Sequence, residues 1–183
     1  DTRMREARKL AQMLGALNEM PKPLIGQIHG AALGGGVGMA CVCDVAIAAK
    51  ETKFGLTETK LGLIPATIGP YVIARIGEGM ARRVFMSARI FDAAEARELG
   101  LVARAVTAAE LPSAVEAEVT PYLSVAPRAV GAAKSLARRL GPRIGEAEIN
   151  ETIKWLADTW EGEEAAHGID AFLTKTKPRW AAD

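Results

Sequence analysis

A glycine-rich turn between two short apolar segments constrains the fold of this chain more than any other feature. Residues 24–29 and 45–48 are each apolar and short enough to form a buried strand. The turn at 30–36 leads into residues 37–43, whose small side chains are typical of a tightly packed helix. Strand, turn, helix and strand within about 25 residues predict a βαβ unit, with parallel strands and a right-handed crossover.

The rest of the chain is predicted to be mainly helical, because apolar residues recur at helical spacing. We expect helices over residues 3–20, 80–88, 92–100, 107–124, 127–141 and 145–175, the last with a break near Gly162. Asp92 with Glu95 is a capping signal for the third of these helices, and residues 101–106 are expected to be extended. The first half thus alternates strand and helix, which is typical of an α/β fold, and the second half is mostly helical.

Composition and charge exclude several classes of protein. The chain has 183 residues, of which 49% are hydrophobic and 25% are charged, and its formal net charge is +1. These values predict one ordinary soluble domain. They predict no nucleic-acid partner, since there is no excess of basic residues to neutralise phosphates. No run approaches the roughly 20 apolar residues that span a bilayer, so we expect no membrane association.

The first residues and the cysteines bear on location and chemistry. Residues 1–6 do not resemble a signal peptide; they lack a start methionine and read as part of a helix, so we expect upstream sequence to be missing.

Cys41 and Cys43 are separated by one residue and have no partners elsewhere, which disfavours a disulfide or a metal site. We expect two buried thiols in a reducing, cytoplasmic compartment, and no metal ion.

The glycine turn is open to three interpretations. Residues 33–36 stand at a predicted helix N-terminus, where free N–H groups and the helix dipole favour an anion or a developing oxyanion. A dinucleotide site would require Gly-x-Gly-x-x-Gly, a spacing that Gly34, Gly36 and Gly38 do not give, and no Gly-Lys-Ser/Thr follows for a P-loop. From these residues alone, close packing of helix against strand remains the alternative to an oxyanion site.

Glu58 is a carboxylate in surroundings that otherwise predict burial. It lies between Thr57 and Thr59, in a segment rich in Leu, Ile and Gly. Burial raises the pKa of a carboxyl group, which suits the group to proton transfer near neutral pH. The alternative is an exposed glutamate at a helix start that pairs with Lys60.

Several longer segments resemble, in the right order, the enoyl-CoA hydratase/isomerase (crotonase) superfamily. The resemblance is carried by residues 22–44, 54–65, 91–96, 100–102 and 168–173. It implies an α/β fold, a crotonase-like ββα spiral with a helical C-terminal trimerisation region. Residues 1–106 would then be a partial catalytic core and residues 107–183 the helical region. A further N-terminal part of the family fold, which carries another oxyanion donor, has no counterpart here.

The resemblance also implies where the chemistry takes place. The backbone N–H of Gly35 is expected to bind the carbonyl oxygen of a CoA thioester, with Leu33 and Gly34 bordering the substrate. Proton transfer next to a thioester passes through an enolate-like state whose charge gathers on that oxygen. A placed N–H donor lowers such a barrier by roughly 3–4 kcal/mol. Glu58 falls on a catalytic acid/base position of the family.

Two further residues are expected to contact substrate or water. Ala66 lies where many hydratases of the family have a glycine whose N–H holds water, and alanine keeps that N–H. Lys175 matches a position that approaches the adenosine phosphate of CoA, with a solvated lysine as an equal alternative. By the same resemblance the substrate is an acyl-CoA thioester, no separate cofactor is needed, and the chain forms a homotrimer or a hexamer made of two trimers.

One position departs from the family pattern. Hydratases with a full catalytic pair carry a second, water-activating glutamate where this chain has Gly38. Glu58 alone suffices to move a proton between two carbons, which favours a 3,2-enoyl-CoA isomerase. Residues 56–72, however, resemble bacterial methylglutaconyl-CoA hydratases, so hydration of the 2,3 double bond of a short or branched enoyl-CoA is the first hypothesis. A non-catalytic acyl-CoA-binding or assembly protein is the alternative from another class.

Overall fold

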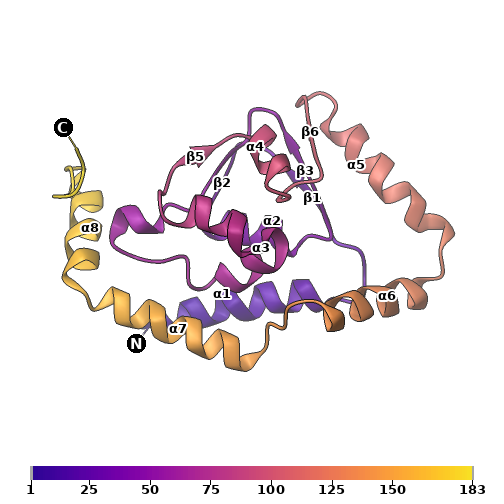
Figure 1. Ribbon diagram of the computed structural model, residues 1–183. Helices are drawn as coiled ribbons and strands as arrows, with labels where there is room; N and C mark the ends of the chain where they lie inside the picture. Colours follow the sequence, from indigo (N-terminus) through magenta and orange to yellow (C-terminus); the bar gives the residue numbers. More distant parts are fainter. Residues whose placement is uncertain (1, 183) are drawn as a thin grey trace.

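Two small sheets form the centre of the structure, a computed structural model that describes residues 2–182 (Figure 1). Their strands are β1 (Ile25–Ile28), β2 (Ala31–Leu33), β3 (Val45–Ala49), β4 (Lys53–Gly55), β5 (Ile90–Phe91) and β6 (Arg104–Val106). One sheet has the order β1-β3-β6 and is parallel throughout. In the other, ordered β2-β4-β5, β2 and β4 are parallel and β5 is antiparallel to β4.

Helices surround these sheets. They are α1 (Thr2–Glu19), α2 (Gly35–Val42), α3 (Gly69–Phe85), α4 (Ala93–Glu98), α5 (Leu111–Val119), α6 (Pro127–Leu140), α7 (Glu146–Trp160) and α8 (Glu163–Thr174), with 3-10 turns η1 (Glu58–Leu61) and η2 (Thr120–Ser124). The helices α1 and α7 lie side by side along one edge of the molecule, and α8 packs on η1 (Figure 1). All described elements after β6 are helical. The division of the chain at residue 106 into two domains stays a prediction.

The predicted relation between the first two apolar strands is confirmed. β1 and β3 are parallel, with Ile25 opposite Val45, and α2 lies between them in the chain. The predicted cap of α4 is also present, because Asp92 Oδ1 accepts a hydrogen bond of 2.9 Å from the N–H of Glu95. Local signals in the sequence therefore located β1, β3, α2 and the start of α4.

Three short strands and the N-terminal part of α3, residues 69–79, were not predicted. β2 has three residues and lies between Gly30 and Gly34, whose φ values are 73° and 48°, so no alternating pattern develops. The helix predicted over residues 80–88 overlaps α3 only at residues 80–85. Gly77, with φ 76°, interrupts α3 and breaks its apolar periodicity.

The main core lies where α1, α2, α3 and the end of β4 meet. Its most buried large side chains include Leu14, Val37, Phe54, Leu56 and Val72. Removing a side chain of this size from water stabilises the fold by about 1.5–3 kcal/mol. This packing fixes α2, and with it the glycine turn from which α2 starts, against the rest of the molecule.

None of the described helices is long and apolar enough to cross a membrane.

Candidate active site

The glycine turn presents free backbone donors at the start of α2. Gly34 precedes α2 with φ 48° and ψ −113°, a conformation that favours glycine, and its own N–H donates to Gly55 O at 2.9 Å. Gly35 is the first residue of the helix, where an N–H has no acceptor within the helix. The positive end of the helix dipole lies at the same point. The turn can therefore donate to an anion or to a developing oxyanion.

The carboxyl group of Glu58 lies against this turn. A Cβ added at Gly34 would lie 3.1 Å from Glu58 Oε1 and 3.9 Å from Glu58 Cδ. Glu58 starts η1, three residues after β4, and β4 pairs with β2, the strand that leads into the turn. The pairing of β2 with β4 thus brings Glu58 next to the turn at Gly34 and Gly35, although Glu58 lies far from these two glycines in the sequence.

The carboxyl group of Glu58 is held in a poorly solvated position. Its Oε2 atom is buried and has no hydrogen-bond partner among residues 2–182. Burial raises the pKa of Glu58, and a hydrogen bond from its own backbone opposes the shift. The group is therefore protonated at pH values where an exposed glutamate is ionised. A raised pKa makes the carboxyl group a better candidate to deliver and recover a proton than an exposed glutamate.

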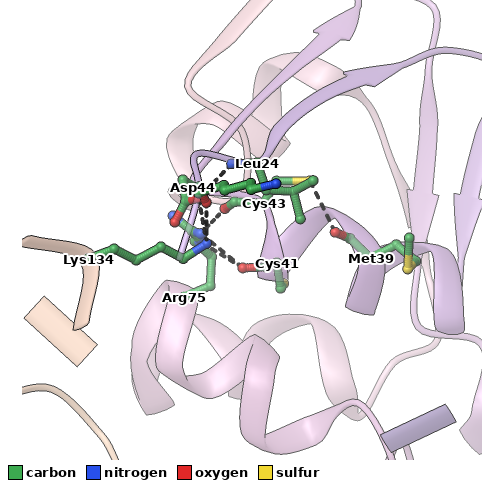
Figure 2. Close-up of polar contacts among 8 residues, drawn as sticks. Leu24, Met39, Cys41, Cys43, Asp44, Arg75 and Lys134 are labelled. Carbon is green, nitrogen blue, oxygen red and sulfur yellow. Dashed lines mark hydrogen bonds and ion pairs between the residues drawn. The ribbon is translucent and has the colours of Figure 1, made fainter. Parts of the chain in front are cut away.

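The far end of α2 is fixed by Arg75 of α3 (Figure 2). Its Nε and Nη2 donate to Cys41 O at 3.0 and 2.9 Å, and its Nη2 also donates to Cys43 O. A cation at the C-terminus of a helix satisfies carbonyl groups that have no intrahelical partner and complements the dipole. Arg75 was not singled out in the sequence, where a bond to backbone oxygens leaves no signal.

A second polar contact secures the segment that follows α2. Asp44 Oδ2 accepts from the N–H of Leu24 and from Lys134 Nζ of α6, both at 2.7 Å (Figure 2). Lys134 Nζ also donates to Lys22 O at 3.0 Å. Together with Arg75, these contacts hold α2 at one end while its other end carries the donors of the glycine turn.

Cys41 and Cys43 are free and buried, as predicted. Burial raises the pKa of Cys41 to about 12, and it also raises the pKa of Cys43. A thiolate is the reactive form of cysteine, so neither residue is a nucleophile near neutral pH. Among the described residues, no three His, Cys, Asp or Glu side chains are grouped closely enough to hold a metal ion.

Gly38, which stands at the position of the second glutamate in the family pattern, faces an apolar wall. A Cβ added at Gly38 would lie 2.7 Å from Ile68 Cγ2 and 3.3 Å from Leu14 Cδ1. Both of these side chains are buried in the main core. The space beside α2 at this level is therefore filled by hydrocarbon, and no carboxylate fits there without a change at Ile68. No pattern in the sequence had indicated the role of Ile68.

Ala66 is buried, and its N–H donates to Ile64 O at 2.8 Å. The donor predicted to hold water thus already has an acceptor within its own loop. Ala66 also lines an apolar cavity of about 360 Å³. The other residues that line this cavity are Thr59, Ile64, Pro65, Gly69, Pro70, Ile73, Phe85, Met86, Thr152 and Trp155. The water-holding role of Ala66 stays a prediction.

The two remaining predicted residues lie at exposed positions. Leu33 ends β2 opposite Gly55 and is 43% exposed, so its side chain borders the turn. Lys175 follows α8 in the left-handed region, with φ 56°, and it is exposed. Among residues 2–182, no ion pair joins Lys175 to Glu58, and its role in binding CoA stays a prediction.

Gly34→Ala tests the contact between the turn and the glutamate. The positive φ of Gly34 strains any residue with a Cβ, and the new methyl would lie 3.1 Å from Glu58 Oε1. We expect the free energy of unfolding to fall by about 1–3 kcal/mol. If Glu58 transfers a proton as the resemblance implies, we expect turnover to fall by roughly tenfold or more, because the carboxyl group is displaced. Thermal denaturation and steady-state kinetics measure the two effects.

Gly100→Ala is the matched control for this variant. Gly100 has φ 81°, and no atom lies within 4 Å of a Cβ added there. It should lose a similar amount of stability while turnover remains at the wild-type value. Equal losses of turnover in the two variants would contradict a specific contact between Gly34 and Glu58.

The chain matches a known protein family. Residues 3–183 match the enoyl-CoA hydratase/isomerase family. A protein from Bacillus subtilis named "probable enoyl-CoA hydratase" is 33% identical over 174 residues, which are 94% of this chain and 67% of that protein. Enoyl-CoA hydratase AKT6-1 of Alternaria alternata is 31% identical over 175 residues, covering 93% of this chain and 58% of that protein.

Solved structures agree with this match. An enoyl-CoA hydratase from Mycobacterium avium superimposes with a TM-score of 0.85 at 29% identity, covering 97% of this chain and 70% of that one. Carnitinyl-CoA hydratase from the same organism gives a TM-score of 0.78 at 30% identity, covering 89% of this chain and 64% of that one. These likenesses confirm the predicted crotonase-like α/β fold. The chain spans 58% of one curated relative and 67% of the other.

Proposed function

The chain belongs to the enoyl-CoA hydratase/isomerase family, and we propose that it adds water across the 2,3 double bond of a short or branched enoyl-CoA thioester. The contact of the Glu58 carboxyl group with Gly34, next to the free N–H of Gly35, is the observation that carries this proposal. An oxyanion donor and a proton donor at one place are what addition next to a thioester requires. The hydratase names of the relatives favour hydration.

The reaction can proceed with one carboxyl group. The Gly35 N–H binds the thioester oxygen while the oxygen of a water molecule forms a bond to C3. The π electrons of the 2,3 double bond move towards the carbonyl group, whose oxygen takes the negative charge of the enolate. Glu58 then donates its proton to C2, and its carboxylate recovers a proton from the attacking water. The sum is the addition of one water molecule, and Glu58 is again protonated.

The apolar cavity beside Ala66 supports an apolar acyl group as the substrate. Thr59, the residue after Glu58, lines this cavity, and so does Trp155 of α7. Its volume of about 360 Å³ is at the small end for ligand sites, which suits a short or branched chain. Among the described residues, no charged side chain lines it. We therefore propose acyl chains without a charge at their far end, and coenzyme A as part of the substrate rather than a separate cofactor.

We also propose that the chain assembles into a homotrimer or a hexamer. Helices of the C-terminal half expose large apolar side chains: Leu136 and Leu140 on α6, and Phe172 and Leu173 on α8. On α6, no residue is buried within the single chain. Apolar surface of this kind marks contacts with other chains.

The surroundings of Gly38 favour a second candidate function, 3,2-enoyl-CoA isomerisation. Because Ile68 and Leu14 fill the space beside Gly38, water would have to be activated without a second carboxylate there. An isomerase needs no water: the carboxylate of Glu58 would remove a proton from C2 of a 3-enoyl-CoA and return it at C4. The Gly35 N–H would stabilise the same enolate in either reaction.

Incubation with a panel of 2-enoyl- and 3-enoyl-CoAs in heavy-oxygen water separates the candidates. Mass spectrometry of the products should show one labelled oxygen in the 3-hydroxyacyl product from at least one 2-enoyl-CoA of short or branched chain. Rearrangement of a 3-enoyl-CoA without label uptake by any substrate would contradict hydration and establish the isomerase. Tight binding of acyl-CoA with no conversion of any panel member would instead indicate a non-catalytic binding protein.

A further inference from the structure

Two glycines interlock the C-terminal helix with the turn that carries Glu58. Gly62 follows η1 with φ 69°, and a Cβ added there would lie 2.4–2.6 Å from backbone atoms of Glu164 and Ala165 in α8. Conversely, a Cβ added at Gly168 of α8 would lie 2.6–2.9 Å from the backbone of Leu61. The two segments therefore meet backbone to backbone, at a distance that only glycine permits at both positions.

The same turn fixes the main chain of Glu58. The N–H of Leu63 donates to Glu58 O at 3.1 Å, and Gly62, at the end of η1, donates to Glu58 O and Thr59 O. Glu58 and Gly62 thus belong to one hydrogen-bonded unit. A displacement of Gly62 by α8 must move the main chain of Glu58 with it, because η1 has only four residues to absorb the change.

The side of α8 that contacts η1 is buried. Ala165 is fully buried, and it packs in one cluster with Leu63 and Ala66, which follow the turn, and with Leu156 of α7. Close packing transmits small displacements rather than absorbing them. A shift of α8 should therefore displace η1, both through the close backbone approach and through this cluster of packed side chains.

We infer that Gly168 is a positioning residue for the proposed reaction: through its close approach to Leu61 of η1, the backbone of α8 sets how far the Glu58 carboxyl group reaches towards Gly34 and Gly35. This inference rests on the proposed function. It gives α8, a helix that starts about a hundred residues after Glu58, a part in placing the proton donor.

Gly168→Ala in the full-length protein tests the inference. The new methyl would lie within 2.9 Å of the Leu61 backbone, so α8 and η1 must separate. We expect kcat to fall by about 10- to 100-fold, because the carboxyl group is misplaced, while KM changes by less than about threefold. In the Glu58→Gln background the same substitution should lower the residual kcat by no more than about twofold, since no carboxyl group is left to position.

Gly100→Ala is the matched control, as it is for Gly34→Ala. Gly100 lies between α4 and β6 with φ 81°, so a Cβ there strains the backbone, and no atom of the described residues lies within 4 Å of it. It should lose stability and keep the wild-type kcat. If Gly168→Ala does not fold, Ala165→Gly replaces it, because this variant loosens the same contact without a clash. It should lower kcat by about three- to tenfold.

The outcomes distinguish the inference from the function on which it rests. Wild-type kcat for Gly168→Ala or for Ala165→Gly, with Glu58→Gln inactive, would overturn the positioning role alone. The positioning role is also overturned if Gly100→Ala lowers kcat as much as Gly168→Ala, or if Gly168→Ala lowers kcat equally with and without the Glu58 carboxyl group. Wild-type turnover in Glu58→Gln would overturn the proposed function itself.

Discussion

Glu58→Gln is expected to lower kcat by about 10²- to 10⁴-fold, with KM nearly unchanged, because the amide keeps the shape of the side chain and has no proton to exchange at C2. The effect should be this large because the carboxyl group lies beside the turn, where a Cβ added at Gly34 would be 3.1 Å from Glu58 Oε1. The buried oxygen Oε2 has no hydrogen-bond partner among residues 2–182. Steady-state kinetics with the preferred enoyl-CoA measures the loss.

The pH dependence of the wild-type protein should report the same group. Burial disfavours the ionised form, so the pKa of Glu58 is raised, and a step that uses the protonated acid slows as the pH rises through that pKa. Glu78→Gln is the control, because the Glu78 side chain is 77% exposed on α3. This variant should behave as wild type, and a Glu58→Gln variant that does the same would exclude Glu58 from catalysis.

Gly35→Pro is expected to lower kcat by about 10²- to 10³-fold, because proline removes the N–H that binds the thioester oxygen. The substitution suits the position, since proline is favoured at the first residue of a helix, and Gly35 is that residue of α2. A Cβ added at Gly35 would meet only Leu10 Cδ2, at an ordinary contact distance of 3.7 Å. Stability should therefore change little while turnover collapses, and the same kinetic assay with a melting curve measures both.

Gly35→Ala separates the lost donor from the added carbon. This variant places a Cβ at the same point and keeps the N–H, so it should remain at least about tenfold more active than Gly35→Pro. Equal activities of the two variants would show that the Gly35 N–H does not bind the substrate oxygen.

The parts of the site that were found from sequence have local signals. A run of glycines before a helix of small residues located Gly35, and a carboxylate in an apolar segment singled out Glu58. The pairing of β1 with β3 followed from the length and apolar character of two segments. The roles of Gly35 and Glu58 came from the resemblance to a family, and they stay predictions until substrate is bound.

Other parts of the site depend on contacts that residue types do not encode. Arg75 donates to Cys41 O, 34 positions earlier, and any residue offers a backbone oxygen. The N–H of Ala66 is engaged by Ile64 O, since the direction of a donor in a loop is set by backbone angles. The wall that Ile68 forms against Gly38 arises only when α3 packs on α2. These features depend on tertiary contacts and backbone angles, which a local sequence pattern does not predict.

A crystal structure of the Glu58→Gln variant with an unreacted 2-enoyl-CoA tests the shared site most directly. We predict the thioester oxygen about 3 Å from the N–H nitrogen of Gly35. C2 should lie roughly 3–3.5 Å from the side chain at position 58. A thioester bound elsewhere, or one that reaches only one of these two groups, would contradict the account.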